Sequence, residues 1–362
     1  MQLWNTLNKE DLVANLREKG FSFVTISFYQ YAKIPNPRLF RDHLFQMWSK
    51  LDVVGRTYVA TEGINAQIAV PVNNLDQFRE ELYQIEFLNG IRLNYSVDDS
   101  EAEFPFLKLK IKVRDKILAD GLNDQTFDVR NKGKHLTPQE FNELTDKPDT
   151  ILIDFRNHYE LEVGHFKGAI LPDVDTFRES LPFIEDTYLK GNEDKNIVMY
   201  CTGGIRCEKA SAWFKHRGFN NVHQLEGGII KYANEIRNQG LENKFIGKNF
   251  VFDERRGERV TEDIISLCHQ CGESADVHTN CVNDACHLLF IQCDSCKAKM
   301  ENCCSDECLH TIHLPEEEQK ALRKGKEASN KIFKKGRSEK LKFKVQKEKP
   351  VSLVEIINTK SK

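Results

Sequence analysis

The first third of the chain alternates between two hydrophobic periods, one typical of strands and the other typical of helices. In chain order the segments are strand 21–31, helix 38–51, strand, turn and strand 55–70, helix 74–85, and strands 91–97 and 107–113. The order β-α-β-β-α-β predicts an α+β domain over residues 1–125, with both helices on one face of an antiparallel sheet. Many functions share this scaffold, so it identifies none of them.

Residues 133–240 have a different rhythm, in which short apolar runs alternate with helical segments. The clearest runs are 151–154, 197–200 and 222–225. Such runs are typical of buried parallel strands, so we expect a central α/β domain. The segment from Leu136 to Glu140 predicts a helix start, with Thr137 as the cap and Pro138 in the first turn.

A cysteine follows one of these runs and opens a glycine-containing loop, Cys201-Thr-Gly-Gly-Ile-Arg206, before a helix expected over 207–217. Backbone N–H groups in such a loop, with the helix N-terminus, form a positive cradle that lowers the pKa of a thiol and holds an anion. We therefore predict that Cys201 is a catalytic nucleophile able to carry a persulfide. The remaining loop residues are Thr202, Gly203, Gly204, Ile205 and Arg206, of which the glycines permit close backbone approach and the arginine adds a cation.

Cys207 lies six residues beyond Cys201 and has two interpretations. It is a candidate resolving thiol that could close a disulfide with Cys201. It also shares helical spacing with Ala210, Ser211 and Phe214, which favours a packed position on the helix. The spacing favours the second interpretation.

Nine of the eleven cysteines lie between residues 268 and 308: Cys268, Cys271, Cys281, Cys286, Cys293, Cys296, Cys303, Cys304 and Cys308. Closely spaced pairs present two thiolates to one tetrahedral ion, so we expect two structural zinc ions within 245–315. A cross-braced scheme assigns Cys268, Cys271, Cys293 and Cys296 to one ion. The other ion takes Cys281, Cys286, Cys308 and either Cys303 or Cys304. His278 or His287 could replace a thiolate, and free thiols or an iron-sulfur cluster are the alternatives.

Charge is distributed unevenly along the 362 residues, whose formal net charge is -3. The stretch 320–349 carries thirteen Lys or Arg against three Glu, so the rest of the chain is acidic. We expect residues 320–362 to form a disordered basic tail, either an electrostatic arm for nucleic acid or a solubilising extension. The N-terminal residues lack the pattern of an export signal and no long apolar run occurs, so we expect a cytoplasmic protein without disulfides.

Residues 136–240 resemble a rhodanese domain in more than the cysteine loop. The matching segments are 152–156, Tyr159-Glu160, 164–166, Gly168-Ala169 and 222–228. Related dual-specificity phosphatases have five residues between Cys and Arg, whereas Cys201 and Arg206 have four, and the smaller loop suits sulfur rather than phosphate. The resemblance also places Asp154, His158 and His165 in structural positions, which argues against an iron site built from them.

Across its length the chain resembles the bacterial tRNA uridine hydroxylases, which form 5-hydroxyuridine at the wobble position. The segments that carry the resemblance are 25–29, 62–65, 112–115, 156–159, 200–208, 245–255 and 268–271. The resemblance implies oxygen-dependent hydroxylation of uridine 34 with Cys201 as the catalytic cysteine, and a ferredoxin-like, acylphosphatase-like N-terminal domain. The sequence has no flavin, nicotinamide or haem motif, so its residues do not explain oxygen activation.

Three classes of function therefore make different demands on Cys201. A hydroxylase needs tRNA, oxygen and Cys201, whose thiolate, persulfide or oxidised form would add to the pyrimidine and make C5 nucleophilic. A sulfurtransferase needs a sulfur donor and moves persulfide sulfur to a tRNA or protein acceptor. A pure binding module would leave Cys201 inert, which the loop does not favour. The expected tRNA contacts come from the basic tail, the zinc segment and the N-terminal sheet.

Overall fold

The computed structural model describes residues 7–98, 102–324 and 338–343, so most of the predicted basic tail lies outside the described residues. The chain forms two compact units. The first contains residues from 1–155, 192–243 and 251–258, and the second contains residues from 156–191, 244–250 and 259–362. No helix among the described residues is long and apolar enough to cross a membrane.

The first unit begins with an α+β domain whose elements are α1 (Lys9–Lys19), β1 (Phe23–Tyr31), α2 (Pro37–Lys50), β2 (Val54–Ala60), β3 (Gly63–Pro71), α3 (Leu75–Tyr83), β4 (Asn94–Tyr95) and β5 (Leu109–Val113). The sheet order is β4-β1-β3-β2-β5. The predicted order of strands and helices is confirmed, with α1 as an unpredicted addition. The sheet is mixed rather than antiparallel, because the long connection after β4 lets β5 pair parallel to β2.

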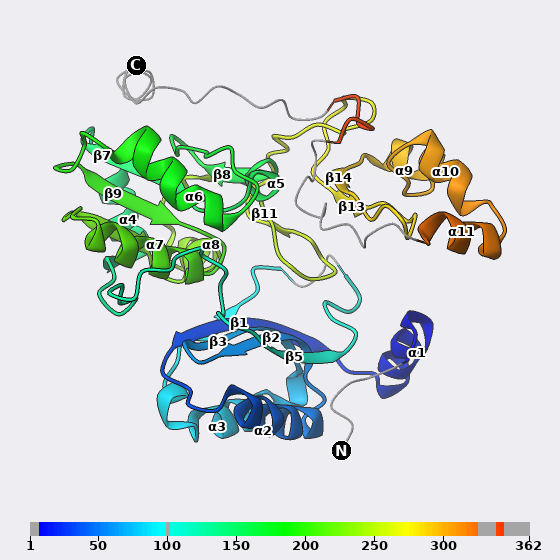
Figure 1. Ribbon diagram of the computed structural model, residues 1–362, viewed down its shortest axis with the longest axis horizontal. Coiled ribbons are helices and arrows are strands. Elements are labelled where there is room, and N and C mark those ends of the chain that lie inside the picture. Colours follow the sequence, from blue (N-terminus) through cyan, green and yellow to red (C-terminus); the bar gives the residue numbers. More distant parts are fainter. Residues whose placement is uncertain (1–6, 99–101, 325–337, 344–362) are drawn as a thin grey trace. The chain divides into compact units, whose positions relative to one another are not determined.

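The two faces of this sheet differ in chemistry. Figure 1 shows α2 and α3 on one face, where Trp48 and Phe78 from the helices pack against Phe28 and other strand residues. Successive residues of a strand point to opposite sides. The other side, which we call the polar face, therefore carries Ser27, Tyr29, Arg56, Tyr58, Asn65, Gln67, Asn94, Lys110 and Lys112.

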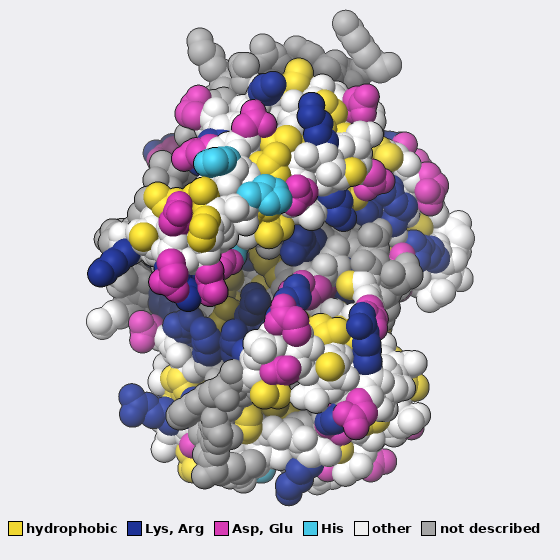
Figure 2. All heavy atoms as spheres, turned by 90° about the vertical axis from the view of Figure 1, so that its right-hand side faces the viewer, with side chains coloured by type: hydrophobic (Ala, Val, Ile, Leu, Met, Phe, Trp, Pro, Cys, Tyr) yellow, Lys and Arg dark blue, Asp and Glu magenta, His cyan; other side chains and the backbone are white. Residues whose placement is uncertain are grey.

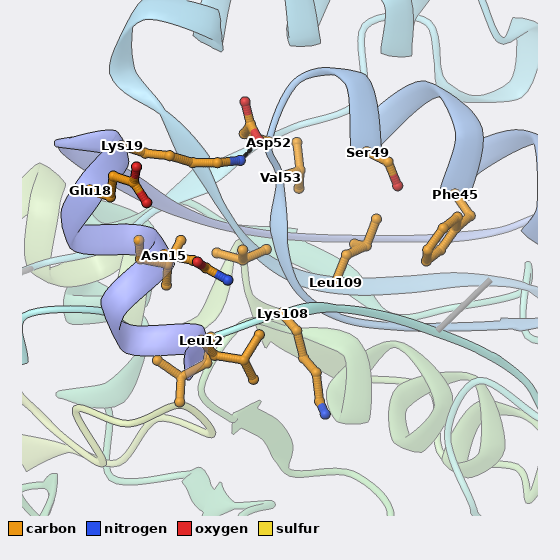
Figure 3. A pocket seen from close by; sticks show the side chains of 13 residues that line it. Leu12, Asn15, Glu18, Lys19, Phe45, Ser49, Asp52, Val53, Lys108 and Leu109 are labelled. Carbon is orange, nitrogen blue, oxygen red and sulfur yellow. Dashed lines mark hydrogen bonds and ion pairs between the residues drawn. The ribbon is translucent and has the colours of Figure 1, made fainter. Parts of the chain in front are cut away.

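Helix α1 crosses one end of the α+β domain and leaves a hollow of about 640 Å³ beside it (Figure 3). Leu12 and Leu16 of α1, Phe45 of α2 and the start of β5 line the hollow. Lys19 and Asp52 form an ion pair at its wall. Leu16 also packs with Phe104 and other apolar residues, so the helix is held by burial as well as by charge.

The remainder of the first unit is a four-stranded parallel sheet with the order β6-β10-β9-β7. Its elements are β6 (Lys134–Leu136), α4 (Pro138–Thr145), β7 (Thr150–Asp154), β9 (Asn196–Tyr200), α7 (Ile205–His216), β10 (Val222–Leu225) and α8 (Gly228–Gln239). The predicted parallel sheet is thus confirmed, as is the capping box of Thr137 and Glu140 at the start of α4.

The second unit contains α5 (His158–Leu161), β8 (Gly164–Phe166), α6 (Phe177–Ile184), β11 (Phe245–Asn249), β13 (His278–Asn280), β14 (Leu289–Ile291), α9 (Asp294–Met300), α10 (Asp306–Ile312) and α11 (Glu316–Arg323). The chain enters this unit at residues 156, 244 and 259, the last of these within β12 (Glu258–Arg259). Strands β8 and β11 pair antiparallel, and so do β13 and β14.

On the side of the molecule drawn in Figure 2, Lys and Arg side chains gather in several places among acidic ones.

Candidate functional site

Cys201 lies directly after β9, an inner strand of the parallel sheet, and has no exposed surface. The backbone N–H of Gly204 donates to its Sγ at 3.1 Å. Burial raises the pKa of Cys201, but hydrogen bonds from the Cys207 thiol and from the backbone of Arg206 and Cys207, with the charge of Arg206, lower it to about 6. A thiol with this pKa is mostly thiolate at neutral pH. The glycine-containing sequence of the loop had led us to expect a lowered pKa.

The loop has its shape because two glycines accept backbone positions closed to other residues. Gly204 has φ of +101°, and a Cβ there would lie 2.9 Å from the Tyr29 hydroxyl. At Gly228, the first residue of α8, a Cβ would lie 2.5 Å from the Cys201 carbonyl oxygen. That carbonyl accepts a hydrogen bond from the Ile229 N–H, so the start of α8 holds the backbone of Cys201 in place.

The other loop and helix residues support the thiolate. Arg206 is buried and donates from Nη2 to the Thr202 hydroxyl at 3.3 Å, with its guanidinium 6.0 Å from the Phe252 ring centroid. Cys207 is fully buried in the first turn of α7. Burial, together with its hydrogen bond to Cys201, raises the pKa of Cys207 well above its ordinary value. Cys207 is therefore a neutral donor to Cys201 in a packed position, the interpretation that its helical spacing favoured. The alternative role, a resolving thiol, stays a hypothesis.

Side chains from the α+β domain reach this loop, which the sequence did not predict. Tyr29 of β1 donates to Glu208 of α7 at 3.3 Å, and Asn94 of β4 donates to the Gly203 carbonyl at 3.4 Å. A Cβ at Gly203 would lie 3.8 Å from Ser27 Oγ. These three residues lie more than 100 residues before the loop in the sequence, so no sequence pattern indicated that they contact it.

Glu208 is the buried carboxylate behind the loop. His135 Nε2 lies 3.0 Å from it, the Gln224 amide donates at 2.7 Å, and Lys132 pairs with it. Burial raises the pKa of Glu208, but hydrogen bonds from His135 and Lys132 lower it to about 2. Glu208 is thus ionised and fully engaged, which suits a residue that holds α7 in place.

Two groups of cysteines in the second unit are close enough to hold an ion, and they are the only such groups among the residues the structure describes. The first group is Cys268, Cys271, Cys293 and Cys296, and the second is Cys281, Cys286, Cys304 and Cys308. Within each group all four sulfur atoms lie within 4.8 Å of one another. Cys303 lies in neither group, nor do His278 and His287.

The spacing of the sulfur atoms can be compared with that of a metal site. Sγ–Sγ distances are 3.6 Å for Cys271 and Cys293 and 3.6 Å for Cys286 and Cys304. A tetrahedral ion with Zn–S bonds of about 2.3 Å requires sulfur atoms about 3.8 Å apart. The two clusters therefore fit tetrahedral ions.

The three residues weighed for an iron site are not in either metal-competent group. Asp154 ends β7 in the first unit. In the second unit His158 Nδ1 lies 3.0 Å from Asp175, and His165 Nδ1 lies 3.2 Å from the Phe166 carbonyl oxygen. These contacts agree with structural positions for the two histidines.

Three family models match the chain. A UPF0176 acylphosphatase-like domain matches residues 23–117, a rhodanese-like domain matches 137–235, and a rhodanese C-terminal model matches 246–309. Together they cover both parts of the first unit and the cysteine clusters.

Proteins named tRNA uridine(34) hydroxylase are similar to this chain over nearly its whole length. That of Photorhabdus laumondii is 52% identical over 336 residues, which cover 92% of this chain and 95% of the relative. That of Salmonella typhimurium is 53% identical with the same coverage. About half of the residues are thus identical across almost all of each protein, and the chain belongs to the tRNA uridine(34) hydroxylase family.

Proposed function

We propose that this protein is an oxidoreductase that hydroxylates the wobble uridine, position 34, of tRNA to 5-hydroxyuridine with molecular oxygen as cosubstrate. The observation that carries the proposal is a thiolate-forming cysteine, Cys201, in a loop of a chain that belongs to this family. Cys201 is the catalytic residue, and residues 202–206 form its loop.

The chemistry needs four electrons to reduce oxygen. Insertion of one oxygen atom at C5 of the uracil takes two electrons from the base. Reduction of the second oxygen atom to water takes two electrons and two protons, which two thiols release when they form a disulfide. Cys201 and Cys207 are hydrogen-bonded and are the pair we assign to this step, so Cys207 is the resolving thiol.

Before that oxidation, the Cys201 thiolate adds to C6 of the pyrimidine ring and makes C5 nucleophilic. After C5 has gained oxygen, loss of its proton breaks the C6–S bond, which restores the C5–C6 double bond and frees the Cys201 thiolate to form the disulfide. Cys201 has no exposed surface, so a base reaches its sulfur only if the surroundings of the loop move.

The test is the mass of nucleosides from tRNA incubated with the protein in air and without air, beside Cys201→Ala and Cys207→Ser variants. A gain of one oxygen on uridine that needs both air and Cys201 is expected. An oxygen gain that survives in Cys201→Ala would overturn the catalytic role. Unchanged single-turnover hydroxylation by Cys207→Ser without added thiol would overturn only the disulfide step.

A sulfurtransferase is the second candidate, favoured by one observation. The N–H groups and Arg206 that stabilise a thiolate would equally stabilise a persulfide on Cys201. In the same experiment this function predicts sulfur, not oxygen, in the modified nucleoside or a protein acceptor, and no requirement for air. A sulfur donor would then be a partner of the protein.

The two cysteine groups are proposed to hold one structural zinc ion each. Eight thiolates in two tetrahedral sets are the donor set that zinc prefers, and neither set offers an open position for catalysis. The ions would fix the loops and short helices of the second unit, where the buried cluster around the second group consists largely of the cysteines themselves.

The proposed partner is the anticodon region of tRNA, with the basic tail as an electrostatic arm. Removing the residues after Lys320 is expected to weaken tRNA affinity and to flatten its salt dependence, measured by anisotropy titrations at several salt concentrations. Identical affinity at every salt concentration would contradict an arm. A cytoplasmic location is also proposed, supported by eleven cysteines of which none forms a disulfide.

A further inference from the structure

The polar face of the N-terminal sheet joins the Cys201 loop to a basic edge through two rows of side chains. Cross-strand pairing sets the first row as Asn94, Ser27, Gln67, Arg56 and Lys110. Residues paired across neighbouring strands lie side by side on one face. The row therefore runs without a break from β4 to β5.

The second row is Tyr29, Asn65, Tyr58 and Lys112, set by the same strand pairings. Its inner member, Tyr29, contacts Glu208 behind the Cys201 loop. Both rows thus begin at the loop and end on β5. Three strand spacings separate β1 from β5, a distance of about 14 Å.

The outer end of the rows is strongly and openly positive. Arg56, Lys110 and Lys112 are exposed, and none has an acidic partner within the described part of the chain. Partial burial, with the positive charges of Lys112, Lys108 and Arg56, lowers the pKa of Lys110. Like charges held together without counter-charges destabilise a fold, so their clustering indicates an anionic ligand.

An aromatic ring lies among these cations. Tyr58 is half-buried between Asn65 and Lys112, and the Arg114 guanidinium lies 5.7 Å from its ring centroid. Sheets that bind single-stranded RNA combine phosphate-binding cations with aromatic rings that stack on bases. The polar face offers both.

The inner end carries polar groups suited to a base. The Ser27 hydroxyl is buried and has no hydrogen-bond partner among the described residues. It lies beside Gly203, and the Asn94 amide is its neighbour in the row. A buried hydroxyl without a partner is costly, so its persistence next to the loop needs a reason.

We propose that the polar face binds the single-stranded anticodon loop of the RNA substrate, with Arg56, Lys110 and Lys112 on phosphates, Tyr58 stacked on a base, and Ser27 and Asn94 beside the uridine at the Cys201 loop. The inference rests on the proposed function for its choice of RNA. The occupant is a short stretch of single strand, because the face spans only a few nucleotides from loop to edge.

The test is a salt titration of binding between the full-length protein and a fluorescent anticodon stem-loop RNA with uridine at position 34. The variant is the triple substitution Arg56→Gln, Lys110→Gln and Lys112→Gln. The matched control removes three exposed cations elsewhere, Arg38→Gln, Lys50→Gln and Lys147→Gln. Unfolding midpoints of both triple variants establish that they fold.

Each phosphate contact with a single strand contributes about 0.7 to the slope of log affinity against log salt, so the triple variant should lose about 2 from that slope. Its affinity at low salt should fall on the order of tenfold or more, while the control keeps its slope. Equal losses in both variants, or none in either, would overturn the inference.

Stacking is tested separately with Tyr58→Leu and Tyr58→Phe. Loss of one stacked base weakens binding roughly tenfold without changing the salt slope, and Phe should restore it. If Tyr58→Leu binds like the parent protein, Tyr58 has no place on the surface. If the parent protein forms no hydroxylated nucleoside yet its binding depends on these residues, the proposed activity fails and the RNA surface stands.

Discussion

At the scale of single residues, the reactivity of Cys201 depends on a balance between burial and hydrogen bonding. Burial alone would keep the sulfur protonated. The thiolate is favoured because the Cys207 thiol and several backbone N–H groups donate to it, and because Arg206 lies nearby. Cys207 stays protonated and can donate its thiol hydrogen, because its own pKa is raised. The two cysteines therefore act as one unit with a single negative charge.

This balance predicts the pH dependence of Cys201. Its pKa in the folded protein is about 6, below its ordinary value, so the thiolate should appear as pH rises through 6 and disappear as pH falls through it. The ultraviolet absorbance of the thiolate, taken as the difference from Cys201→Ser, measures the titration. Cys207→Ala should move the midpoint upward, whereas Cys207→Ser keeps a donor and should move it less. A midpoint that ignores both substitutions would exclude Cys207 as the donor.

The backbone of the loop gives a second prediction at this scale. Gly204→Ala faces a positive φ and a collision with the Tyr29 hydroxyl, whereas Gly218→Ala faces a similar φ of +97° with nothing within 4 Å. Positive φ costs an ordinary residue about 1–3 kcal/mol, and overpacking adds about 1–3 kcal/mol more. Chemical denaturation should show the larger loss for Gly204→Ala.

Tyr29→Phe tests the source of that difference. It removes the hydroxyl that the new Cβ would meet, so Gly204→Ala should cost less in a Tyr29→Phe background than in the parent protein. Equal costs in the two backgrounds would show that only the backbone conformation matters at Gly204.

At the scale of elements, periodicity predicted most strands and helices, because each depends on residues close in sequence. The parallel pairing of β5 with β2 was not predictable, since it depends on the path of the chain after β4. Within the cysteine segment the alternation of pairs was readable, but the choice between Cys303 and Cys304 was not. Cys303 and Cys304 are neighbours, so their distances in sequence from Cys308 differ by only one residue. Only the fold shows that Cys304, and not Cys303, lies close to Cys281 and Cys286.

That choice can be tested by metal content. Cys304→Ser should release one of two zinc ions per chain, because a tetrahedral thiolate set loses a ligand. Cys303→Ser is the matched control, since Cys303 is equally buried but belongs to neither group, and should retain both ions. Native mass spectrometry of the full chain counts the ions. Loss of zinc from the Cys303 variant alone would reverse the assignment.

At the scale of the whole molecule, buried ion pairs stabilise the first unit, and their partners could not be predicted from the sequence. Lys209 of α7 has only 1% of its side chain exposed and donates to Asp120 at 2.5 Å and to Glu62 at 3.0 Å. Burial raises the pKa of Asp120, but hydrogen bonds from Lys116 and Lys209 lower it below its ordinary value. Lysines on helices are mostly exposed, and these partners lie 89 and 147 residues away. The helix that follows Cys201 is thereby tied to the β2–β3 turn of the α+β domain.

Lys209→Met should therefore destabilise the protein strongly. The substitution keeps most of the apolar length but leaves the Asp120 carboxylate buried, with Lys116 as its remaining cation and the Leu122 N–H as its backbone donor. Breaking a buried ion pair costs about 3–5 kcal/mol, and the remaining lysine places the expected loss near the lower end. Adding Asp120→Leu removes the stranded charge and should recover part of the loss, measured by urea unfolding of the three variants. Additive losses in the double variant would mean that Lys209 and Asp120 stabilise the unit independently. The contact between α7 and the α+β domain would then have to depend on the hydrogen bond from Tyr29 to Glu208 instead.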